Sequence, residues 1–373
     1  MAKIIVNLLQ STGTKGGLEI YARELYSQFG QMETGHEFVG YASKELVKKG
    51  APWFPGRLVD SGISGENRVA WAWGELLRVS RFAAREKADL IHGPAMLGPL
   101  RSTTPVVISF HDVLYFTHPH LMQTKLFTEP VKWMEKRAAA NSTRIITISK
   151  VSARAIERHL HVNPDRIDLI PLAGRATKPA GVVKARADDL FLAIGQRSPY
   201  KDLPTVVRAW SHIPAEQRPR LVITGSFGDD PLIPLVRELG LESWVELKSW
   251  IPTEELGELF STATALIDPT LAAGFGMPAI EAMMIGLPVI LSDTEVFREV
   301  GADAVDYFHA GDPVDLARAV VELASNPQRR KELSQLGLTR STGFSWHKVA
   351  NETLVSFDLA MSQAAAAKSG RRG

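Results

Sequence analysis

Short apolar stretches alternate along the chain with longer segments in which apolar residues recur every three or four positions. In the first half the stretches are KIIVNLL (3–9), HEFVGYA (36–42), ADLIHGP (88–94), PVVISF (105–110), RIITIS (144–149) and RIDLIP (166–171). Apolar runs of this length predict buried strands, and the segments with helical spacing predict helices over 18–29, 69–87 and 149–160. Such alternation indicates a mostly parallel sheet with helices on both faces.

Residues 174–188 interrupt this pattern with glycine, proline and charged side chains, which indicates a linker. Beyond it we predict strands at 189–195, 220–225, 244–250, 264–270 and 287–293, and helices at 203–213, 231–241, 253–263 and 278–286. The result is an α/β protein of two doubly wound domains, 1–173 and 189–345, whose strand ends face each other across a cleft, a usual place for a nucleotide. A long helix is predicted over 345–363, and the end, 364–373, is expected to be disordered.

Loops with candidate chemistry follow the first strand of each half. The loop STGTKGGLEIYARE (11–24) resembles a phosphate loop but lacks the full dinucleotide fingerprint, so a plain tight turn fits it equally well. In GQRSPYKDLPTVVRAW (195–210), Lys201 stands just before a predicted helix start. An ammonium group beside helix amides suits a diphosphate, and a solvated lysine is the alternative. Arg197 is a weaker candidate of the same kind.

A third loop opens the segment PTLAAGFGMPAIEAMM (269–284). Gly274 and Gly276 let backbone N–H groups approach an anion, and Pro278 suits the first turn of a helix whose positive end would face that anion. Glu281 would lie about one turn into the helix, within reach of ribose hydroxyls. The alternative, a solvated helix glutamate, is disfavoured by its apolar neighbours.

His111 and Asp112 follow a predicted strand of the first half, where either a structural or a ligand-contacting histidine would fit. No D-x-D, H-E-x-x-H or G-x-S-x-G motif occurs in the sequence. Their absence argues against a metal-chelating transferase, a zinc hydrolase and a serine hydrolase.

Taken in order, these motifs resemble those of the retaining glycosyltransferases of family 4 over nearly the whole chain. Five stretches carry the resemblance: GGLEIYARELYSQF (16–29), ADLIHGPAMLGPL (88–100), VVISFHDVLYFTHP (106–119), the donor-domain-like segment 221–293, and FSWHKVANETL (344–354). The second and third are similar to bacterial mannosyltransferase-like members. The resemblance implies the GT-B fold, two Rossmann-like domains across a cleft, with a helix over about 346–373 crossing back to the first domain.

The resemblance also implies roles for individual positions. Lys201 would bind the diphosphate of a nucleotide-sugar donor, Glu281 would hold its ribose, and His111 would contact the transferred sugar. The other donor-binding positions would be Gly16 and Gly17 under the sugar and phosphates, Trp250 and Ile251 around the base, and Arg197, Gly274, Phe275, Gly276 and Met277 near the diphosphate. No cofactor and no metal are expected, since cationic groups would neutralise the diphosphate.

Two positions depart from the family pattern. The arginine that often follows the glycine of the second loop is Gln196 here, and Arg197 comes one step late, on the opposite side of an extended segment. Ala273 stands at the first position of the E-x7-E motif, whose glutamate would contact the transferred sugar. It is either a natural residue or a change introduced into the chain. Loss of such a group costs about 1.5–3 kcal/mol, or roughly 10- to 100-fold in rate.

We therefore expect a retaining, metal-independent hexosyltransferase of cell-surface polysaccharide or glycolipid assembly. GDP-mannose is the first donor to consider, from the resemblance, and UDP and dTDP sugars remain open. The acceptor would be a glycan or a lipid-linked molecule. Two alternatives are a nucleotide-sugar-binding or scaffold protein silenced at Ala273, and a nicotinamide-dependent oxidoreductase, which the incomplete glycine fingerprint disfavours.

Charge adds an expected partner surface. Residues 1–172 hold 22 Lys and Arg against 16 Asp and Glu, although the whole chain carries a net +2. Basic side chains accompany aromatic ones in ELVKKGAPWFPGRL (45–58) and VAWAWGELLRVSRFAAREK (69–87), which suits anionic lipid, whereas Trp at helical spacing is also typical of a core. We expect peripheral membrane contact and no nucleic-acid partner.

Location is read from what the sequence lacks. The first residues do not resemble a secretion signal, and no apolar stretch approaches the roughly 20 residues of a membrane span. With no cysteine, disulfides and thiolate metal sites are excluded. The expected location is the cytoplasm, at the inner face of the cytoplasmic membrane.

Overall fold

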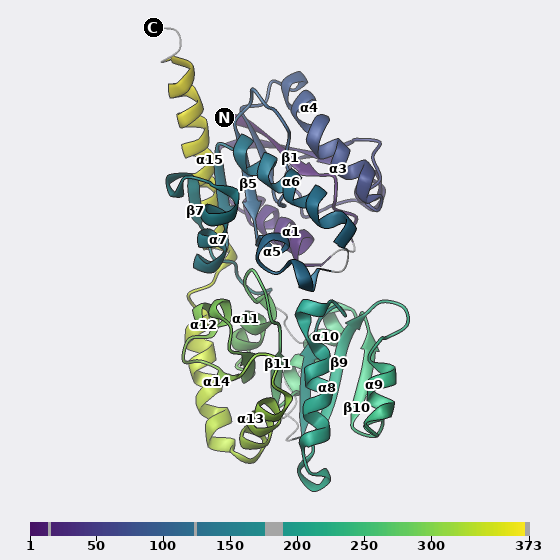
Figure 1. Ribbon diagram of the computed structural model, residues 1–373. Helices are drawn as coiled ribbons and strands as arrows, with labels where there is room; N and C mark the ends of the chain where they lie inside the picture. Colours follow the sequence, from purple (N-terminus) through teal and green to yellow (C-terminus); the bar gives the residue numbers. More distant parts are fainter. Residues whose placement is uncertain (14–15, 123–124, 176–188, 370–373) are drawn as a thin grey trace. The chain divides into compact units, whose positions relative to one another are not determined.

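The structure, a computed structural model, describes residues 1–13, 16–122, 125–175 and 189–369. The chain divides into two compact units (Figure 1). The first takes residues 1–117, 126–172 and 346–373, and the second takes 118–125 and 173–345. Of the expected linker, residues 176–188 lie outside the described part of the chain.

The first unit contains a seven-stranded parallel sheet in the order β3-β2-β1-β4-β5-β6-β7. Its strands are β1 Ala2–Leu8, β2 His36–Ala42, β3 Arg57–Asp60, β4 Leu90–Gly93, β5 Val106–Phe110, β6 Arg144–Thr147 and β7 Ile167–Leu169. The order reverses between β1 and β4, which is the arrangement of a doubly wound fold. The core is formed by apolar strand residues such as Ile5, Ile91 and Phe110 packed against helix residues.

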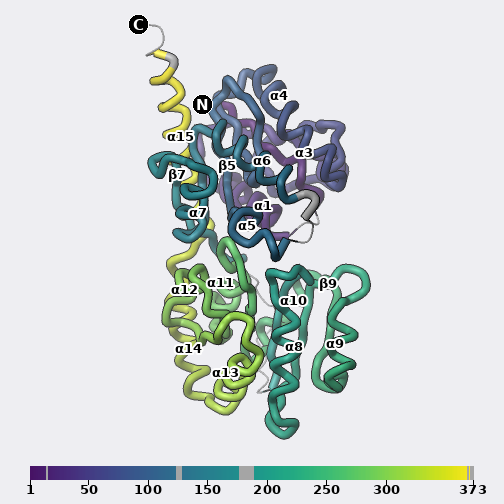
Figure 2. Tube along the Cα trace, viewed as in Figure 1, coloured from purple at the N-terminus to yellow at the C-terminus, as the bar shows by residue number. Residues whose placement is uncertain are grey.

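The helices of this unit are α1 Gly17–Phe29, α2 Lys44–Lys49, α3 Arg68–Leu77, α4 Val79–Arg85, α5 Leu114–Thr117, α6 Lys125–Asn141, α7 Lys150–Leu160 and α15 Trp346–Ser369. The last helix lies beside α1, although the two are far apart in sequence; Figure 2 shows it as the yellow end of the trace. Tyr21 of α1 contacts Trp346, and Phe29 contacts Phe357.

The second unit contains a six-stranded parallel sheet in the order β10-β9-β8-β11-β12-β13. Its strands are β8 Leu190–Ile194, β9 Arg220–Ser226, β10 Val245–Ser249, β11 Ala265–Asp268, β12 Val289–Ser292 and β13 Asp306–Phe308. Its helices are α8 Leu203–His212, α9 Ile233–Glu238, α10 Thr253–Thr262, α11 Met277–Met284, α12 Glu295–Gly301, α13 Pro313–Ser325 and α14 Pro327–Ser341. Trp210 is fully buried in its core. The prediction of two doubly wound α/β folds is confirmed.

Local chemistry explains several helix starts. Ser149 accepts a hydrogen bond from the backbone N–H of Ser152 at the start of α7. Asp312 accepts from Val314 N (2.9 Å) and Asp315 N (3.1 Å) at the start of α13, directly before Pro313. These are N-cap contacts, which satisfy amides that the first turn leaves without partners.

Some predicted boundaries are wrong. The single helix predicted over 69–87 is two helices, α3 and α4, that meet at Arg78. The end predicted as disordered is helical to Ser369 in the described residues, because its alanine run has high helix propensity. Strands β3 and β13 were not predicted, since they have only four and three residues and no continuous apolar run. Helix α14 has little apolar periodicity and was missed for that reason.

Candidate functional site

Chemically active side chains gather at the carboxyl edge of the second sheet. Lys201 lies in the loop after β8, and residues 269–276 form the loop after the neighbouring strand β11. Two contacts join these loops: Lys201 Nζ donates to Thr270 Oγ1 (3.1 Å), and Leu271 N donates to Tyr200 O (2.8 Å). The structure therefore brings the predicted lysine to the predicted glycine loop.

The Thr270 hydroxyl group links Lys201 to a buried carboxylate through two hydrogen bonds. An ammonium group can only donate, so the Thr270 hydroxyl accepts from Lys201 and gives its own hydrogen to Asp268 Oδ1. Asp268 also accepts from Thr270 N (3.2 Å), and its Oδ2 has no hydrogen-bond partner among the described residues. Neither residue was predicted as part of the site, although Asp268 closes an apolar strand, the position where side chains reach a strand-end site.

The glycine loop leads into α11 as predicted. Gly276 is the N-cap residue and has φ +125°, a conformation that L side chains rarely adopt. A Cβ there would lie 2.8 Å from Cε1 of Phe297, so close packing also requires glycine. The Phe275 side chain is buried against Phe344 (ring centroids 5.7 Å apart), which leaves only its backbone to face a ligand. Pro278 lies in the first turn of α11, and Ala273 is half-buried in the loop.

Glu281 lies inside α11 and is buried, with 2% of its surface exposed. Its carboxylate accepts hydrogen bonds from the Arg175 side chain, Nε to Oε1 at 2.7 Å and Nη2 to Oε2 at 3.3 Å. A buried carboxylate needs a partner of this kind. The alternative considered from the sequence, a solvated helix glutamate, therefore does not apply. Arg175 was not predicted, since no local pattern links it to a residue 106 positions away.

Arg197 is engaged within the second unit. Its Nε and Nη2 donate to Asp230, at 2.9 and 2.6 Å, and its Nη1 donates to the carbonyl oxygens of Gly195 and Thr224. Both side chains of this ion pair are 8% exposed. The geometry fits a structural arginine that fastens the loop after β8 to the next strand, and we do not include Arg197 among the anion-binding groups below.

Two exposed aromatic rings end the neighbouring strands β9 and β10. Phe227 and Trp250 are 62% and 47% exposed and stack with their ring centroids 5.3 Å apart. The backbone N–H of Trp250 donates to Ser226 O (2.9 Å), which fixes the two loops together, and Ile251 is half-buried beside them. A flat base could stack on such a platform, and only the Trp250 and Ile251 half of it was predicted.

In the first unit, His111 lies at the carboxyl end of β5 and is 7% exposed. Burial lowers the pKa of His111 to about 4, against a smaller opposing effect of Pro94 O, which lies 3.2 Å from Nε2. The imidazole is therefore neutral near pH 7, and because a carbonyl only accepts, Nε2 carries the hydrogen. Tyr21 packs edge-on against this ring at 4.6 Å.

A buried polar chain supports this strand end. Tyr26 Oη contacts His92 Nδ1 (2.6 Å), His92 Nε2 contacts Ser109 Oγ (3.2 Å), and Ser109 Oγ contacts Tyr21 Oη (2.9 Å). Burial lowers the pKa of His92 to about 3 and raises that of Tyr21 to about 12, so the chain carries no charge at neutral pH. It orients Tyr21, and through Tyr21 the ring of His111.

The glycine loop of the first unit already holds a carboxylate. Gly16 is the N-cap of α1 and Gly17 its first residue, while residues 14 and 15 lie outside the described part. Glu19, in the first turn, is 3% exposed and accepts from Thr12 N (3.0 Å). Since this acid faces the positive end of α1, it partly offsets the attraction of that end for an anion.

The predicted membrane-facing residues divide into exposed and buried ones. Trp73 is 58% exposed, and Arg78, Arg81 and Arg85 are exposed with it on α3 and α4. Phe54, in contrast, is 7% exposed and packs near Tyr26, so its expected contact with lipid is wrong. No helix in the described part of the chain is long and apolar enough to cross a membrane.

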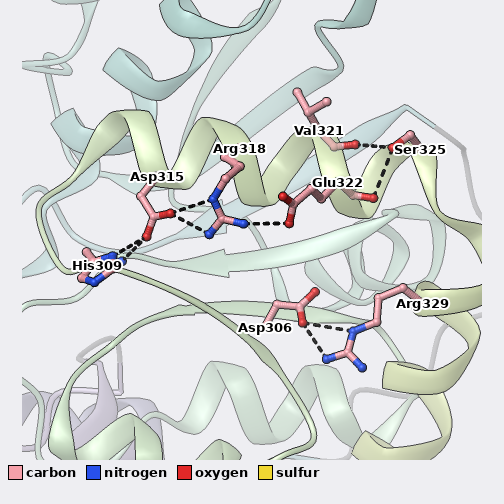
Figure 3. A network of polar contacts seen from close by, with 8 residues as sticks. All are labelled: Asp306, His309, Asp315, Arg318, Val321, Glu322, Ser325 and Arg329. Carbon is pink, nitrogen blue, oxygen red and sulfur yellow. Dashed lines mark hydrogen bonds and ion pairs between the residues drawn. The ribbon is translucent and has the colours of Figure 1, made fainter.

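A polar hollow of about 560 Å³ lies near the amino end of β13 and is lined by Asp306, Tyr307, Arg318, Ala319, Glu322, Leu323, Ser325, Asn326 and Arg329. Figure 3 shows that its charged groups already pair with one another. Arg329 donates to Asp306 (2.7 Å), and Arg318 donates to Asp315 (2.6 Å) and Glu322 (2.8 Å). Paired surface charges of this kind offer little to a ligand.

Comparison with known proteins bears on both units. Residues 15–173 match the family model Glycosyltransferase Family 4, and residues 175–339 match the model Glycosyl transferases group 1. The chain is 28% identical over 300 residues to an O-antigen chain mannosyltransferase B of Escherichia coli, covering 76% of this chain and 77% of that protein. It is 28% identical over 396 residues to a D-inositol 3-phosphate glycosyltransferase of Frankia alni, covering 95% and 97%.

Solved structures share the architecture. A sucrose-phosphate synthase from Thermosynechococcus elongatus superposes with a TM-score of 0.78 at 18% identity, covering 97% of this chain and 100% of that one. Anabaena HepE, solved in complex with UDP, superposes with a TM-score of 0.71 at 15% identity, covering 96% and 100%. At these identities the likeness concerns the fold, which is the two-domain GT-B fold.

Proposed function

Because this chain belongs to the family 4-like glycosyltransferases, we propose that it transfers a hexose from a nucleotide sugar to a hydroxyl group of a glycan or lipid-linked acceptor. The observation that carries the proposal is the pair of contacts by which Lys201 meets Thr270 and Leu271 meets Tyr200. They hold an ammonium group beside the loop that starts α11. A cation and free helix amides at one sheet edge suit a diphosphate.

In the proposed mechanism these groups act on the leaving group. Lys201 and the amides around Gly276 stabilise the negative charge that develops on the diphosphate as the sugar becomes oxocarbenium-like. With that charge neutralised by the protein, a metal ion is not required. We further propose retention of configuration, in which the acceptor attacks on the leaving-group side and a phosphate oxygen takes the hydroxyl proton. His111, neutral at pH 7, contributes a hydrogen bond to the sugar and no charge.

GDP-mannose is the first donor that we propose. An O-antigen mannosyltransferase is among the relatives, which supports mannose, and the inositol phosphate glycosyltransferase supports a polar, non-protein acceptor. The structural likeness to HepE, solved with UDP, supports a nucleoside diphosphate in general and keeps uridine donors in the test. Phe227 and Trp250 would stack on the base, a contact that does not itself distinguish guanine from uracil.

A second candidate function is supported by Ala273. The residue leaves a methyl group where the E-x7-E pattern has a carboxylate, so a protein that binds the nucleotide sugar without transferring the hexose is the alternative. It would keep Lys201 and Glu281 for nucleotide binding and lack turnover.

Incubation with a panel of GDP, UDP and dTDP sugars, followed by mass spectrometry of a mixed glycan and lipid-linked acceptor pool, tests both. We expect one donor to be consumed with a matching hexose added to an acceptor. Binding of a nucleotide sugar with neither hydrolysis nor transfer would favour the silenced protein. Absence of binding to every donor would refute both.

A further inference from the structure

Within the described residues, the Glu281 carboxylate is paired with Arg175. Arg175 Nε donates to Oε1 at 2.7 Å, its Nη2 donates to Oε2 at 3.3 Å, and its backbone N donates to Oε1 at 3.2 Å. The Glu281 side chain is 3% exposed, whereas that of Arg175 is 21% exposed. A buried carboxylate is thus fixed by a residue that itself reaches the surface.

The two carboxylate oxygens are used unequally. Among the described residues, Oε1 receives two donors, one of them at 2.7 Å, while Oε2 receives a single donor at 3.3 Å, beyond the usual range for an N–H···O contact. A carboxylate can accept about four hydrogen bonds, so Oε2 keeps the larger unused capacity. The geometry leaves one oxygen locked and the other available to a further donor.

Gly174 makes this arrangement possible. A Cβ at Gly174 would lie 2.9 Å from Glu281 N, closer than real Cβ contacts come, and 3.0 Å from Glu281 Cγ, which is also very tight. Glycine therefore lets the backbone of residues 174 and 175 lie directly on α11, and only then can Arg175 N reach Oε1. Chain packing and the ion pair act on the same carboxylate.

We propose that Arg175 is a positioning residue for donor binding: it locks Oε1 of Glu281 so that Oε2 accepts a hydrogen bond from a ribose hydroxyl group. The inference rests on the proposed nucleotide-sugar site. A hydrogen bond from a ribose hydroxyl group to a fixed carboxylate contributes more to affinity than one to a mobile carboxylate, because less side-chain freedom is lost when the ligand binds. Arg175 also keeps the buried carboxylate paired before any ligand arrives.

Two other roles for Arg175 predict different effects of its removal on nucleotide affinity. If Arg175 only occupied the carboxylate and competed with the ribose, its removal would strengthen nucleotide binding. If the ion pair only supported the fold, its removal would weaken binding of ribose and deoxyribose nucleotides alike.

Calorimetric titration with GDP and UDP, and with the 2′-deoxy and 3′-deoxy forms of whichever binds, separates these roles. For the unaltered chain we expect at least one deoxy form to bind about 10-fold more weakly, the value of one hydrogen bond to a charged group. In Arg175→Ala the affinity for the ribonucleotide should fall until most of its advantage over the deoxy form is gone. The affinity for that deoxy form should stay within about 2-fold of its value in the unaltered chain. Arg175→Lys should recover part of the preference, since it restores a charged donor.

Further variants serve as controls for this titration. Glu281→Gln should abolish the same preference, and Arg175→Ala combined with it should add nothing, because both act on one hydrogen bond. Arg318→Ala removes an arginine that pairs with Asp315 and Glu322 on α13, and should leave all affinities unchanged. If Arg175→Ala is not folded by circular dichroism, Arg175→Lys and Glu281→Gln still give the comparison.

Equal or tighter ribonucleotide binding by Arg175→Ala would overturn the proposal, and so would an equal loss for ribose and deoxyribose forms. If the unaltered chain binds neither GDP nor UDP, the proposed function fails instead, and the two failures are thereby distinguished.

Discussion

Lys201 is held by a hydroxyl group and has no direct carboxylate partner within 4 Å among the described ion pairs, so its charge remains available to an anion. Lys201→Ala should weaken binding of the nucleotide diphosphate by roughly 10- to 100-fold, because a charge-assisted hydrogen bond in a partly buried site is lost. Titration calorimetry with GDP and UDP measures this. Lys248→Ala is the matched control, since Lys248 pairs with Glu255 on the same unit. Unchanged affinity in Lys201→Ala would remove this residue from the site.

Ala273 gives a prediction about turnover. Ala273→Glu restores the missing carboxylate of the E-x7-E pattern and should raise the transfer rate by about 10-fold or more, with little change in nucleotide affinity, because in the proposed site the group would contact the sugar and not the nucleotide. Product formation with the consumed donor is the readout. A folded variant that transfers no faster would mean that this chain works with alanine there.

The residue scale also shows what the sequence could and could not predict. Lys201 and the loop at Gly274 and Gly276 were predictable, because each follows a strand and parallel strand ends share one edge. The contacts of Arg175 with Glu281, 106 positions apart, and of Lys201 with Thr270, 69 positions apart, were not, since they depend on how the backbone places distant side chains. Arg197, one step beyond the position where the family pattern has its arginine, was the weaker candidate, and its side chain pairs with Asp230.

At the scale of elements, α6 carries an acid in an apolar setting. Glu135 is 1% exposed, and burial, with a smaller effect of nearby Asp112, raises its pKa well above the ordinary value of 4.5. The folded chain thus keeps a proton that the unfolded chain releases above about pH 4.5. This group costs nothing at lower pH and destabilises the fold progressively as the pH rises toward its folded pKa.

Glu135→Gln should therefore raise the free energy of unfolding more at pH 8 than at pH 5, by at least about 1 kcal/mol, the value of less than one pKa unit. Urea unfolding followed by circular dichroism at both pH values measures the difference. Glu129→Gln, on the same helix with its side chain 79% exposed, is the control and should show no such trend. An equal effect of Glu135→Gln at the two pH values would contradict the assignment.

Elements were predictable where apolar runs are continuous. Strand β8, with the sequence LFLAI, is almost entirely buried and contains no polar residue, and β1 has the continuous apolar run Ile4, Ile5 and Val6. Strand β3 has a half-buried pattern over only four residues and gave no signal. Helix α14 is mostly polar, and it packs on α11 through small positions: a Cβ on Gly337 would lie 3.1 Å from Met283 Cγ. Such a helix is stabilised by its neighbours, which periodicity does not report.

For the whole molecule, the basic and aromatic surface of α3 and α4 gives a membrane prediction. Exposed Trp73 on α3 and exposed Arg81 and Arg85 on the adjoining α4 suit anionic lipid, because the ring would enter the interface and each arginine would add about 1 kcal/mol near the surface. The chain should float with vesicles containing phosphatidylglycerol at low salt and less at high salt. Trp73→Ser with Arg81→Glu and Arg85→Glu should abolish flotation.

Arg208→Glu with Arg237→Glu is the control for charge, since both arginines are exposed on the second unit. Loss of flotation in this control as well would indicate a general charge effect. No flotation of the unaltered chain at either salt concentration would refute the membrane contact. Lys49 is unsuitable for such a test, because its Nζ donates to Gly13 O at 2.7 Å and supports the glycine loop.

Because α15 belongs to the first unit, that unit can complete its fold only after the rest of the chain has been synthesised. Phe357 packs on His92 (4.9 Å) and Phe29, and Ser356 donates to Asp168 (2.6 Å), so the first unit lacks these partners until its last helix leaves the ribosome. Between Leu172 and Phe357 the ribosome must make residues 173–345, the larger part of the second unit, which takes roughly 10 to 40 seconds at ordinary translation rates. Throughout that interval the rings of His92 and Phe29 lack the contact with Phe357, and residues 173–345 can fold before α15 joins the first unit.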